Sequence, residues 1–276
     1  MIRFIIDSTF GISKEFAKKE NIKVVSLKMM LDGKTTEETY PDEWEPFYQD
    51  LIKSKNFPTS SQPNPQNFID AIEEIYSEDE NAEIIILTIA EFLSGTINSA
   101  KIATNNYPNK KIFAVDTGAV CACSVMMLEE MLDMAKKGKT FEEICEIAPK
   151  IKENLQIVFV PSTMEYLKRG GRVGKLSACI LDILKIKPIF RFINNKISVP
   201  KKSIGTIKAF SDAITMLPQK IKKISACFIY DKTHLPLLLK KLNEKINKKI
   251  DEFAVSPMFG VHVGVGSVGI ATLSEY

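Results

Sequence analysis

Residues 166–175, YLKRGGRVGK, combine three glycines with four cations shortly after an apolar run at 156–161. Glycines expose backbone N–H groups and cations neutralise phosphate, so this composition is typical of phosphate-binding loops. A P-loop, however, has a glycine five positions before its Gly-Lys pair and a Ser or Thr directly after it. Here Arg169 stands five positions before the pair Gly174–Lys175, and Leu176 follows it. The spacing therefore excludes a nucleotide loop of this kind.

Two groups of hydroxyl side chains stand at the ends of predicted elements. Asp7–Ser8–Thr9 closes the first predicted strand, and ligands of open parallel sheets bind beyond such ends. A turn with a cap also explains this tripeptide, and this is the favoured interpretation when the tripeptide is considered alone. In the predicted loop at 59–63, Asn64 is the best-placed N-cap of the helix that follows. Ser60 and Ser61 are then left to donate hydrogen bonds to an acceptor.

Ser94, Gly95 and Thr96 form a third group, at the junction of a predicted strand with a predicted helix. The glycine permits close approach, and the N–H groups and dipole of a helix start favour an anion. Ser94 adds a hydroxyl donor to that arrangement. The alternative is that Ser94 is an ordinary N-cap.

The segment 260–269, GVHVGVGSVG, contains a literal GxGxxG motif. A dinucleotide-binding interpretation needs a following helix and an acidic residue about 20 positions further on, and only seven residues follow here. His262 lies between glycines too small to bury it, which favours ligand contact over a purely structural role. Ser94, His262 and Asp7 supply the residue types of a catalytic triad, but no serine stands in a G-x-S-x-G elbow.

Alternation of strands and helices predicts how these residues are positioned. Strands are predicted at 2–7, 23–27, 83–89, 111–116, 156–161, 187–193, 196–199 and 225–230, with two more near the end. Helices are predicted from 14, at 42–53, 65–77, 94–106 and 120–137, from 140, at 175–184, from 207 and at 235–247. We expect an N-terminal α/β domain, 1–155, with a doubly wound, mostly parallel sheet. The order of predicted strands and helices changes after residue 155, which predicts a C-terminal α+β domain, 156–276.

Composition narrows the class of protein. The 276 residues are 45% hydrophobic and 26% charged, which is typical of a globular protein. Five cysteines without CxxC spacing predict reduced thiols, and two histidines are too few for a His-based metal cluster. The first ten residues lack a continuous apolar signal, so we expect a cytoplasmic protein without stable membrane insertion.

The charge is divided unevenly. Residues 1–150 hold 16 Lys and Arg against 25 Asp and Glu, a balance of −9, and residues 151–276 hold 21 against 9, a balance of +12. This asymmetry supports two domains with different partners. The basic half is compatible with a DNA-associated regulator, but it contains no recognisable helix-turn-helix, zinc finger or RNA-binding motif. We expect no nucleic-acid partner.

Five motifs in one order resemble the DegV family, bacterial fatty-acid-binding proteins that serve as the binding subunit of fatty acid kinase. They are DST at 7–9, SSQP at 60–63, LSGT at 93–96, LKRGGRVGK at 167–175 and GVHVGVG at 260–266. The resemblance covers about residues 3–274. It implies a buried tunnel for one long-chain fatty acid, whose carboxylate lies at the domain junction.

The resemblance also implies roles for single residues. The family's carboxylate-binding hydroxyls fall on Ser60 and Ser94, and its nearby histidine falls on His262. A separate ATP-dependent kinase subunit then phosphorylates the carboxylate, and the acyl-phosphate enters phospholipid synthesis. The binding subunit itself would be a monomer with no catalytic residue, metal or cofactor. Lys168, Arg169 and Arg172 are candidates for docking the kinase, although a solvated basic turn explains each of them as well.

Departures from the family pattern concern the head-group region. Serine replaces threonine at position 60, which keeps the hydroxyl, and Val265 stands where the family has proline. Glu91 and Phe92 replace two small residues, so we expect them to narrow the head-group pocket or repel an anion. The alternative function is a serine- and histidine-dependent hydrolase or acyl transferase acting on a lipid, with Ser94 and His262 as its reactive pair.

Overall fold

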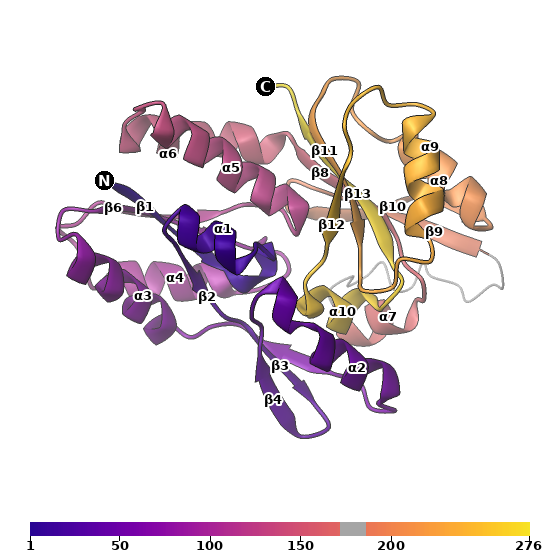
Figure 1. The fold of residues 1–276 in the computed structure, drawn as a ribbon, viewed down its shortest axis with the longest axis horizontal. Coiled ribbons are helices and arrows are strands. Elements are labelled where there is room, and N and C mark those ends of the chain that lie inside the picture. Colours follow the sequence, from indigo (N-terminus) through magenta and orange to yellow (C-terminus); the bar gives the residue numbers. More distant parts are fainter. Residues whose placement is uncertain (172–185) are drawn as a thin grey trace.

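The structure is a computed structural model that describes residues 1–171 and 186–276. Its first sheet has the strand order β2-β1-β6-β7, and all neighbouring strands are parallel. The strands are β1 (Ile2–Asp7), β2 (Ile22–Val25), β6 (Glu83–Thr88) and β7 (Ile112–Asp116). Residues 84–87 of β6 are wholly buried, because helices cover both faces of a parallel sheet. The predicted doubly wound sheet is therefore confirmed (Figure 1).

Helices begin where capping residues predict them. Asn64 forms a capping box with Asn67 at the start of α3 (Pro65–Glu78), and Thr140 forms one with Glu143 at the start of α6 (Phe141–Glu153). One face of the sheet packs against α3 and α4 (Thr96–Thr104). The opposite face packs against α1 (Lys14–Lys19), α5 (Ala122–Lys136) and α6.

The second sheet has the order β10-β9-β8-β13-β11-β12, antiparallel except for the pair β11 and β12. Its strands are β8 (Leu155–Val160), β9 (Ile186–Ile193), β10 (Lys196–Ile204), β11 (Ile221–Phe228), β12 (Asp251–Ala254) and β13 (Val268–Ser274). On one face lie α8 (Thr206–Ile214) and α9 (Leu235–Asn243). On the other lies α5, which contacts β13 and so connects the two sheets. We propose the domain division at residues 155 and 156, where the first strand of this sheet starts.

A small antiparallel sheet, β4-β3-β5, corrects the expectation of one strand at 23–27 followed by loops. It consists of β3 (Lys28–Leu31), β4 (Lys34–Glu37) and β5 (Thr59–Ser61). The turn between β3 and β4 is Asp32–Gly33, and both residues have positive φ, 51° and 77°. Asp-Gly is a strong hairpin signal that the sequence interpretation missed. Between β4 and β5 lie a 3₁₀ turn (Pro41–Glu43) and α2 (Glu45–Lys53).

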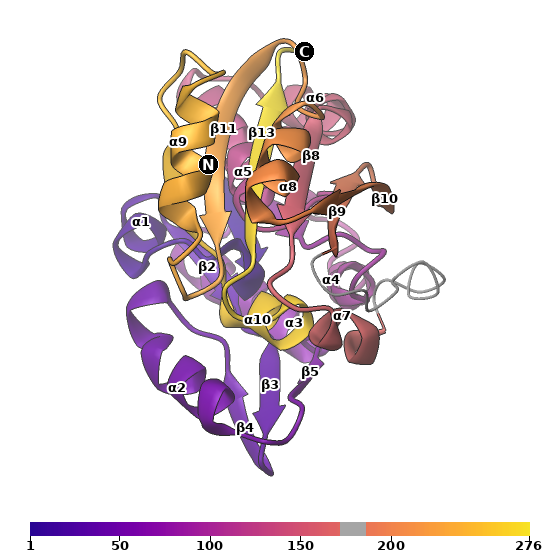
Figure 2. The ribbon, with the colours of Figure 1, turned by 90° about the vertical axis from the view of Figure 1, so that its right-hand side faces the viewer.

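Two short helices differ from expectation near the C-terminal sheet. Residues 257–263 form α10 (Pro257–Val263), where a glycine loop was expected, and α7 (Glu165–Gly170) covers the start of the basic segment. The two helices lie side by side at one end of the second sheet, next to β5 (Figure 2). The helix predicted at 175–184 lies outside the described residues. Within the described part of the chain, no helix has the length and apolar character needed to cross a membrane.

Candidate ligand-binding site

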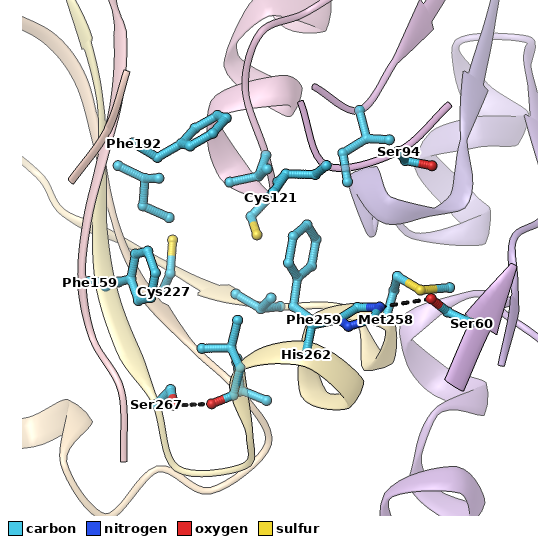
Figure 3. Close-up of a pocket in the computed structure, with 18 of the residues that line it drawn as sticks. Ser60, Ser94, Cys121, Phe159, Phe192, Cys227, Met258, Phe259, His262 and Ser267 are labelled. Atoms are coloured by element: carbon cyan, nitrogen blue, oxygen red, sulfur yellow. Dashed lines mark hydrogen bonds between the residues drawn. The ribbon is translucent and has the colours of Figure 1, made fainter. Parts of the chain in front are cut away.

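A largely apolar cavity lies where the first sheet, the second sheet and β5 meet, with a volume of about 410 Å³. That size is within the usual range for small-molecule sites, about 300–1,000 Å³. Leu27, Ile89 and Leu93 contribute to it from the first sheet's side, and Phe159, Phe192 and Cys227 from the second. Figure 3 shows the hydroxyls of Ser60 and Ser94 on one side and the rings of Phe159 and Phe192 on the other. One end of the cavity is therefore polar and the other apolar.

The polar end is built by residues far apart in the sequence. Ser60 lies on β5, and its Oγ is 2.7 Å from Nε2 of His262, which lies in the last turn of α10. Ser94 precedes α4, and its Oγ is 2.8 Å from Oγ1 of Thr96. Gly95 is the N-cap residue of α4, with no side-chain hydrogen bond to the helix. Two hydroxyls, an imidazole and a helix start thus converge on one end of the cavity.

Most of the predicted ligand-binding residues line this cavity. Ser60, Ser61, Ser94, Gly95 and His262 do so. Thr96 is wholly buried behind Ser94 and is absent from the cavity wall. The secondary structure around two of these residues was predicted wrongly. Ser60 lies on a strand and His262 lies on a helix, whereas a loop was expected at both positions.

The basic segment lies against the helix that carries His262. A Cβ added at Gly170 would come within 3.0 Å of Nδ1 of His262, so the close packing of α7 on α10 requires a small residue there. Leu167 of α7 lines the cavity. Arg169 instead places its guanidinium 3.7 Å from the ring centre of Phe57 and also pairs with Glu165. Lys168 is exposed.

The predicted docking residues therefore have different surroundings. Neither Lys168 nor Arg169 forms part of the cavity wall, although the residue before them does. Arg172 lies outside the described residues. Lys168 and Arg169 remain candidates for contact with a partner, and the role of Arg172 stays a prediction.

Comparison with known proteins places the chain in a family. A family model described as an uncharacterised protein of the DegV family matches residues 1–275. The chain belongs to the DegV family. A DegV domain-containing protein of Clostridium perfringens is 34% identical over 284 residues, which cover 99% of each chain. The family resemblance carried by the five motifs is thereby confirmed.

Solved structures of DegV family proteins have the same fold. The structure of a DegV family protein from Thermus thermophilus, which is described by its fatty acid binding, has a TM-score of 0.88 at 24% identity. The match covers 99% of each chain. A stearic acid-binding protein of Eubacterium ventriosum has a TM-score of 0.88 at 21% identity, covering 99% of this chain and 98% of the other. These similarities show the fold of the chain.

Two cysteines, for which the sequence analysis predicted only reduced thiols, line the cavity. Cys121 and Cys227 both line it, and burial raises the pKa of Cys227 to about 12 and that of Cys121 well above its usual value. Both thiols therefore stay protonated and apolar in character at neutral pH. Cys121 has a φ of 53°, a strained conformation for a residue with a side chain. The pattern of cysteines alone contains no signal for this placement.

Gln62 is a further wall residue that the sequence interpretation missed. Its side chain lies so close to Gly95 that a Cβ there would clash with the amide. Its Nε2 also donates to Ser99 Oγ at 3.2 Å. Gln62 thus ties the strand that carries Ser60 to the start of α4. The glycine at position 95 is required for this approach.

Glu91 and Phe92 do not narrow the polar end, contrary to expectation. Neither lines the cavity, and both face the second sheet. The ring of Phe92 lies 6.2 Å from that of Phe192. Glu91 Oε1 lies 3.5 Å from Nδ2 of Asn195, in the turn between β9 and β10. These two departures from the family pattern form contacts between the sheets.

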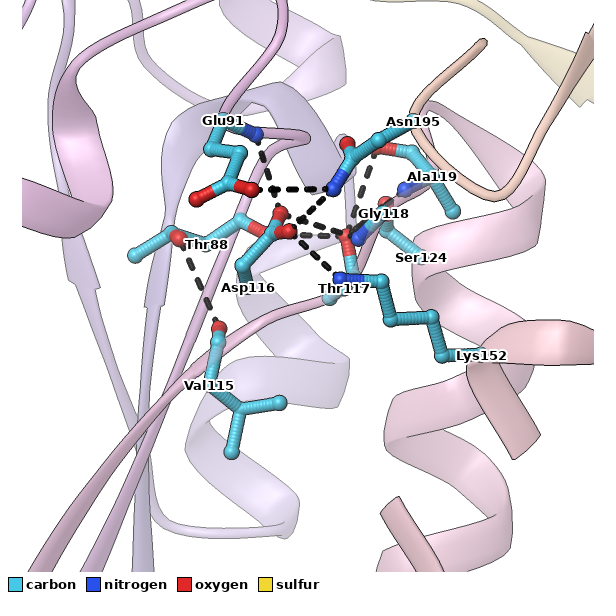
Figure 4. A network of polar contacts seen from close by, with 10 residues as sticks. All are labelled: Thr88, Glu91, Val115, Asp116, Thr117, Gly118, Ala119, Ser124, Lys152 and Asn195. Atoms are coloured by element: carbon cyan, nitrogen blue, oxygen red, sulfur yellow. Dashed lines mark hydrogen bonds and ion pairs between the residues drawn. The ribbon is translucent and has the colours of Figure 1, made fainter. Parts of the chain in front are cut away.

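Asp116 is the centre of the polar network between the sheets (Figure 4). Its Oδ2 lies 2.7 Å from Lys152 Nζ and 2.5 Å from Asn195 Nδ2. Its Oδ1 accepts from the backbone N–H of Glu91 and of Gly118, both at 2.9 Å. Asp116 ends β7, so the network joins the carboxyl edge of the first sheet to a turn of the second.

Proposed function

We propose that the protein binds one long-chain fatty acid, with its tail in the apolar end of the cavity and its carboxylate at Ser60, Ser94 and His262. The observation that carries this proposal is the cavity itself, which is largely apolar and has two hydroxyls and an imidazole at one end. The DegV family proteins of similar fold that bind fatty acids support the same ligand class.

The two ends of such a ligand have different energetic roles. Each buried methylene of a tail contributes about 0.8 kcal/mol, so the tail supplies the affinity. A buried carboxylate without hydrogen bonds would be costly or would protonate. Charge-assisted hydrogen bonds contribute about 1.5–3 kcal/mol each, and donors from Ser60 and Ser94 offset the cost of desolvation. The head group would thus be kept ionised and in a fixed orientation.

An oriented carboxylate is a nucleophile for phosphoryl transfer. We propose that a separate ATP-dependent kinase subunit brings the phosphoryl donor, as the family resemblance implies. A carboxylate oxygen forms a bond to the γ-phosphorus, the bond from that phosphorus to the β,γ-bridging oxygen breaks, and ADP leaves. The product is an acyl-phosphate, which would enter phospholipid synthesis in the cytoplasm. The binding protein would contribute position and charge, with His262 close to the reacting oxygen.

We place the kinase contact on Lys168 and Arg169, the exposed cations of α7, together with Arg172. The support is that Lys168 and Arg169 lie between Leu167, which lines the cavity, and Gly170, which packs close to His262. A monomer with one such face would present its carboxylate to one kinase active site.

Native mass spectrometry of the purified protein tests the binding proposal. We expect an adduct with the mass of one long-chain fatty acid, which disappears on delipidation and returns with added palmitic acid. A protein that neither carries nor takes up a fatty acid would refute the proposed function. Incubation with a fatty acid kinase and ATP would then test acyl-phosphate formation, detected as a hydroxamate.

A hydrolase or acyl transferase remains the second candidate, because of one distance. Ser60 Oγ and His262 Nε2 are 2.7 Å apart, as in a pair of nucleophile and general base. The structure pairs His262 with Ser60, whereas the sequence interpretation had paired it with Ser94. A serine-reactive fluorophosphonate probe separates the two functions. A hydrolase would be labelled at Ser60, and a binding subunit would remain unlabelled.

A further inference from the structure

Three residues of the cavity wall are held by the same kind of contact. Leu27 follows β2, Ile89 follows β6 and Met258 lies on α10, and all three line the cavity. Each donates its backbone N–H to a buried side chain. Leu27 donates to Ser8 Oγ at 3.0 Å, Ile89 to Asp7 Oδ2 at 2.6 Å and Met258 to Glu38 Oε1 at 2.8 Å.

The three acceptors form one connected group. Asp7 and Ser8 are adjacent at the end of β1, and Ser8 Oγ donates to Glu38 Oε2 at 2.7 Å. Asp7, Ser8 and Glu38 are 0%, 2% and 0% exposed. The DST motif therefore lies behind the cavity wall, and Glu38 connects it to α10. None of the three side chains lines the cavity.

This group is expensive to bury. Within the described ranges, 1–171 and 186–276, neither Asp7 nor Glu38 forms an ion pair with a cation, and their negative charges oppose each other. Burial raises the pKa of Glu38 to about 7 and that of Asp7 to about 6. Apolar residues in place of buried ionisable groups are often neutral or stabilising. A gain in stability therefore does not explain why these groups are buried. Their hydrogen bonds to the cavity wall do explain it.

The connection from Glu38 continues to the polar end of the site. Glu38 accepts the N–H of Met258, in the first turn of α10. His262 follows Met258 by four positions, so both residues lie on one face of the helix. A displacement of the first turn of α10 would move His262 relative to Ser60, which lies on β5 of the small sheet.

We propose that Glu38 is a positioning residue for the ligand site, which fixes α10 and thereby the His262 imidazole against Ser60. This inference rests on the proposed function for its ligand, but its structural part can be tested without one. Ser8 supports Glu38 by holding its second oxygen. The Glu38 side chain itself does not line the cavity.

Four variants test the role of Glu38. Glu38→Ala removes the acceptor of the Met258 N–H, and Glu38→Gln keeps an oxygen acceptor of the same shape. Ser8→Ala removes the hydroxyl that supports Glu38 and that also accepts the Leu27 N–H. Glu37→Ala is the matched control, because Glu37 is the exposed neighbouring carboxylate. Titration with palmitic acid should give about tenfold weaker binding for Glu38→Ala, because the first turn of α10 would move and Met258, which lines the cavity, would move with it. Glu38→Gln and Glu37→Ala should stay within about threefold of the parent.

A spectroscopic readout tests the positioning without ligand. The chain contains two histidines, so the ring signals of His262 can be followed by NMR beside those of His234, the N-cap residue of α9. We expect Glu38→Ala to shift the His262 signals, Glu38→Gln to restore them and His234 to stay unchanged in both. If Glu38→Ala fails to fold, Ser8→Ala decides the matter, with a smaller shift of the same signals.

The outcomes separate the two proposals. A parent protein that binds no palmitic acid refutes the proposed function, and the His262 signals still test the positioning. The role of Glu38 is overturned if the parent binds palmitic acid and either Glu38→Ala or Ser8→Ala has the same affinity and the same His262 signals as Glu37→Ala. Failure of Glu38→Gln to restore the signals overturns it as well.

Discussion

Ser60 Oγ lies 2.7 Å from His262 Nε2 across 202 positions of sequence. The pair joins β5 of the small sheet to α10, which packs at the end of the second sheet. Ser94 reaches the same end of the cavity from the first sheet. The candidate head-group site therefore exists only when all three sheets are assembled.

Removal of the head-group hydroxyls should weaken binding of palmitic acid. Ser60→Ala and Ser94→Ala each remove one donor, and we expect about tenfold weaker binding for each. Isothermal titration of the delipidated protein measures this. Ser77→Ala, at an exposed serine near the end of α3, is the control. A double Ser60→Ala, Ser94→Ala variant that purifies with parental fatty-acid occupancy would show that the head group binds elsewhere.

His262 should matter more for phosphoryl transfer than for affinity. Its ring contacts Ser60 and can stabilise the charge of the phosphoryl group that is transferred to the carboxylate. For His262→Ala we expect acyl-phosphate formation to fall at least tenfold, with palmitic acid affinity changed by less than about threefold. His234→Ala is the matched control. Undiminished acyl-phosphate formation by His262→Ala would contradict this role.

Reversal of charge beside α7 should weaken docking of the kinase. Arg169→Glu combined with Arg172→Glu replaces attraction by repulsion, and the loss should be largest at low ionic strength. Binding to the kinase subunit at several salt concentrations measures it. Phe57→Leu removes the ring under Arg169 but keeps the charge, so it controls for lost packing. If docking and its salt dependence are unchanged in the charge-reversed variant, the contact lies on another face.

Glu38 predicts a pH dependence of stability. Its pKa in the folded protein is about 7, above the ordinary value of 4.5. The folded state therefore binds the proton more tightly, and the free energy of unfolding falls as pH rises from about 4.5 to about 7. The fall from this group is about 3 kcal/mol. Denaturant titrations at pH 5 and 8 should show a smaller fall for Glu38→Gln than for the parent. Equal falls in both proteins would assign the dependence to other groups such as Asp7.

The turn between β9 and β10 allows a clean test of the network at Asp116. Asn194 and Asn195 both have positive φ, 46° and 58°, so alanine costs similar backbone strain at either position. Only Asn195 donates to Asp116. We expect Asn195→Ala to lower the free energy of unfolding by about 1–2 kcal/mol more than Asn194→Ala. Equal losses would mean that the network adds nothing to the stability of the fold.

The parallel sheet and several helix starts could be predicted from local sequence. The β-branched run at 84–86 marks a central strand, and Asn64 and Thr140 carry capping signals that the structure confirms. Most of the candidate ligand-binding residues were predicted through the family resemblance. Hydroxyls such as those of Ser60 and Ser94 are common at helix starts for purely local reasons.

Other features could not be predicted because their partners are distant in sequence. Glu38 looks like one of many acidic residues until its contacts to Ser8 and Met258, 30 and 220 positions away, are known. The environment of His262 was predictable in principle. Ser256–Pro257 begins α10 with the proline at its start, the same signal that was used correctly at Asn64–Pro65.

The division of the candidate head-group site among three sheets has a thermodynamic consequence. A ligand that touches Ser60, Ser94 and His262 together has no comparable site on any one of these sheets alone. Binding therefore stabilises the assembled sheets by an amount that grows with ligand concentration, and the melting temperature rises with it. In a cell, the amount of folded protein would then report the supply of its ligand, because empty molecules would open and be degraded first.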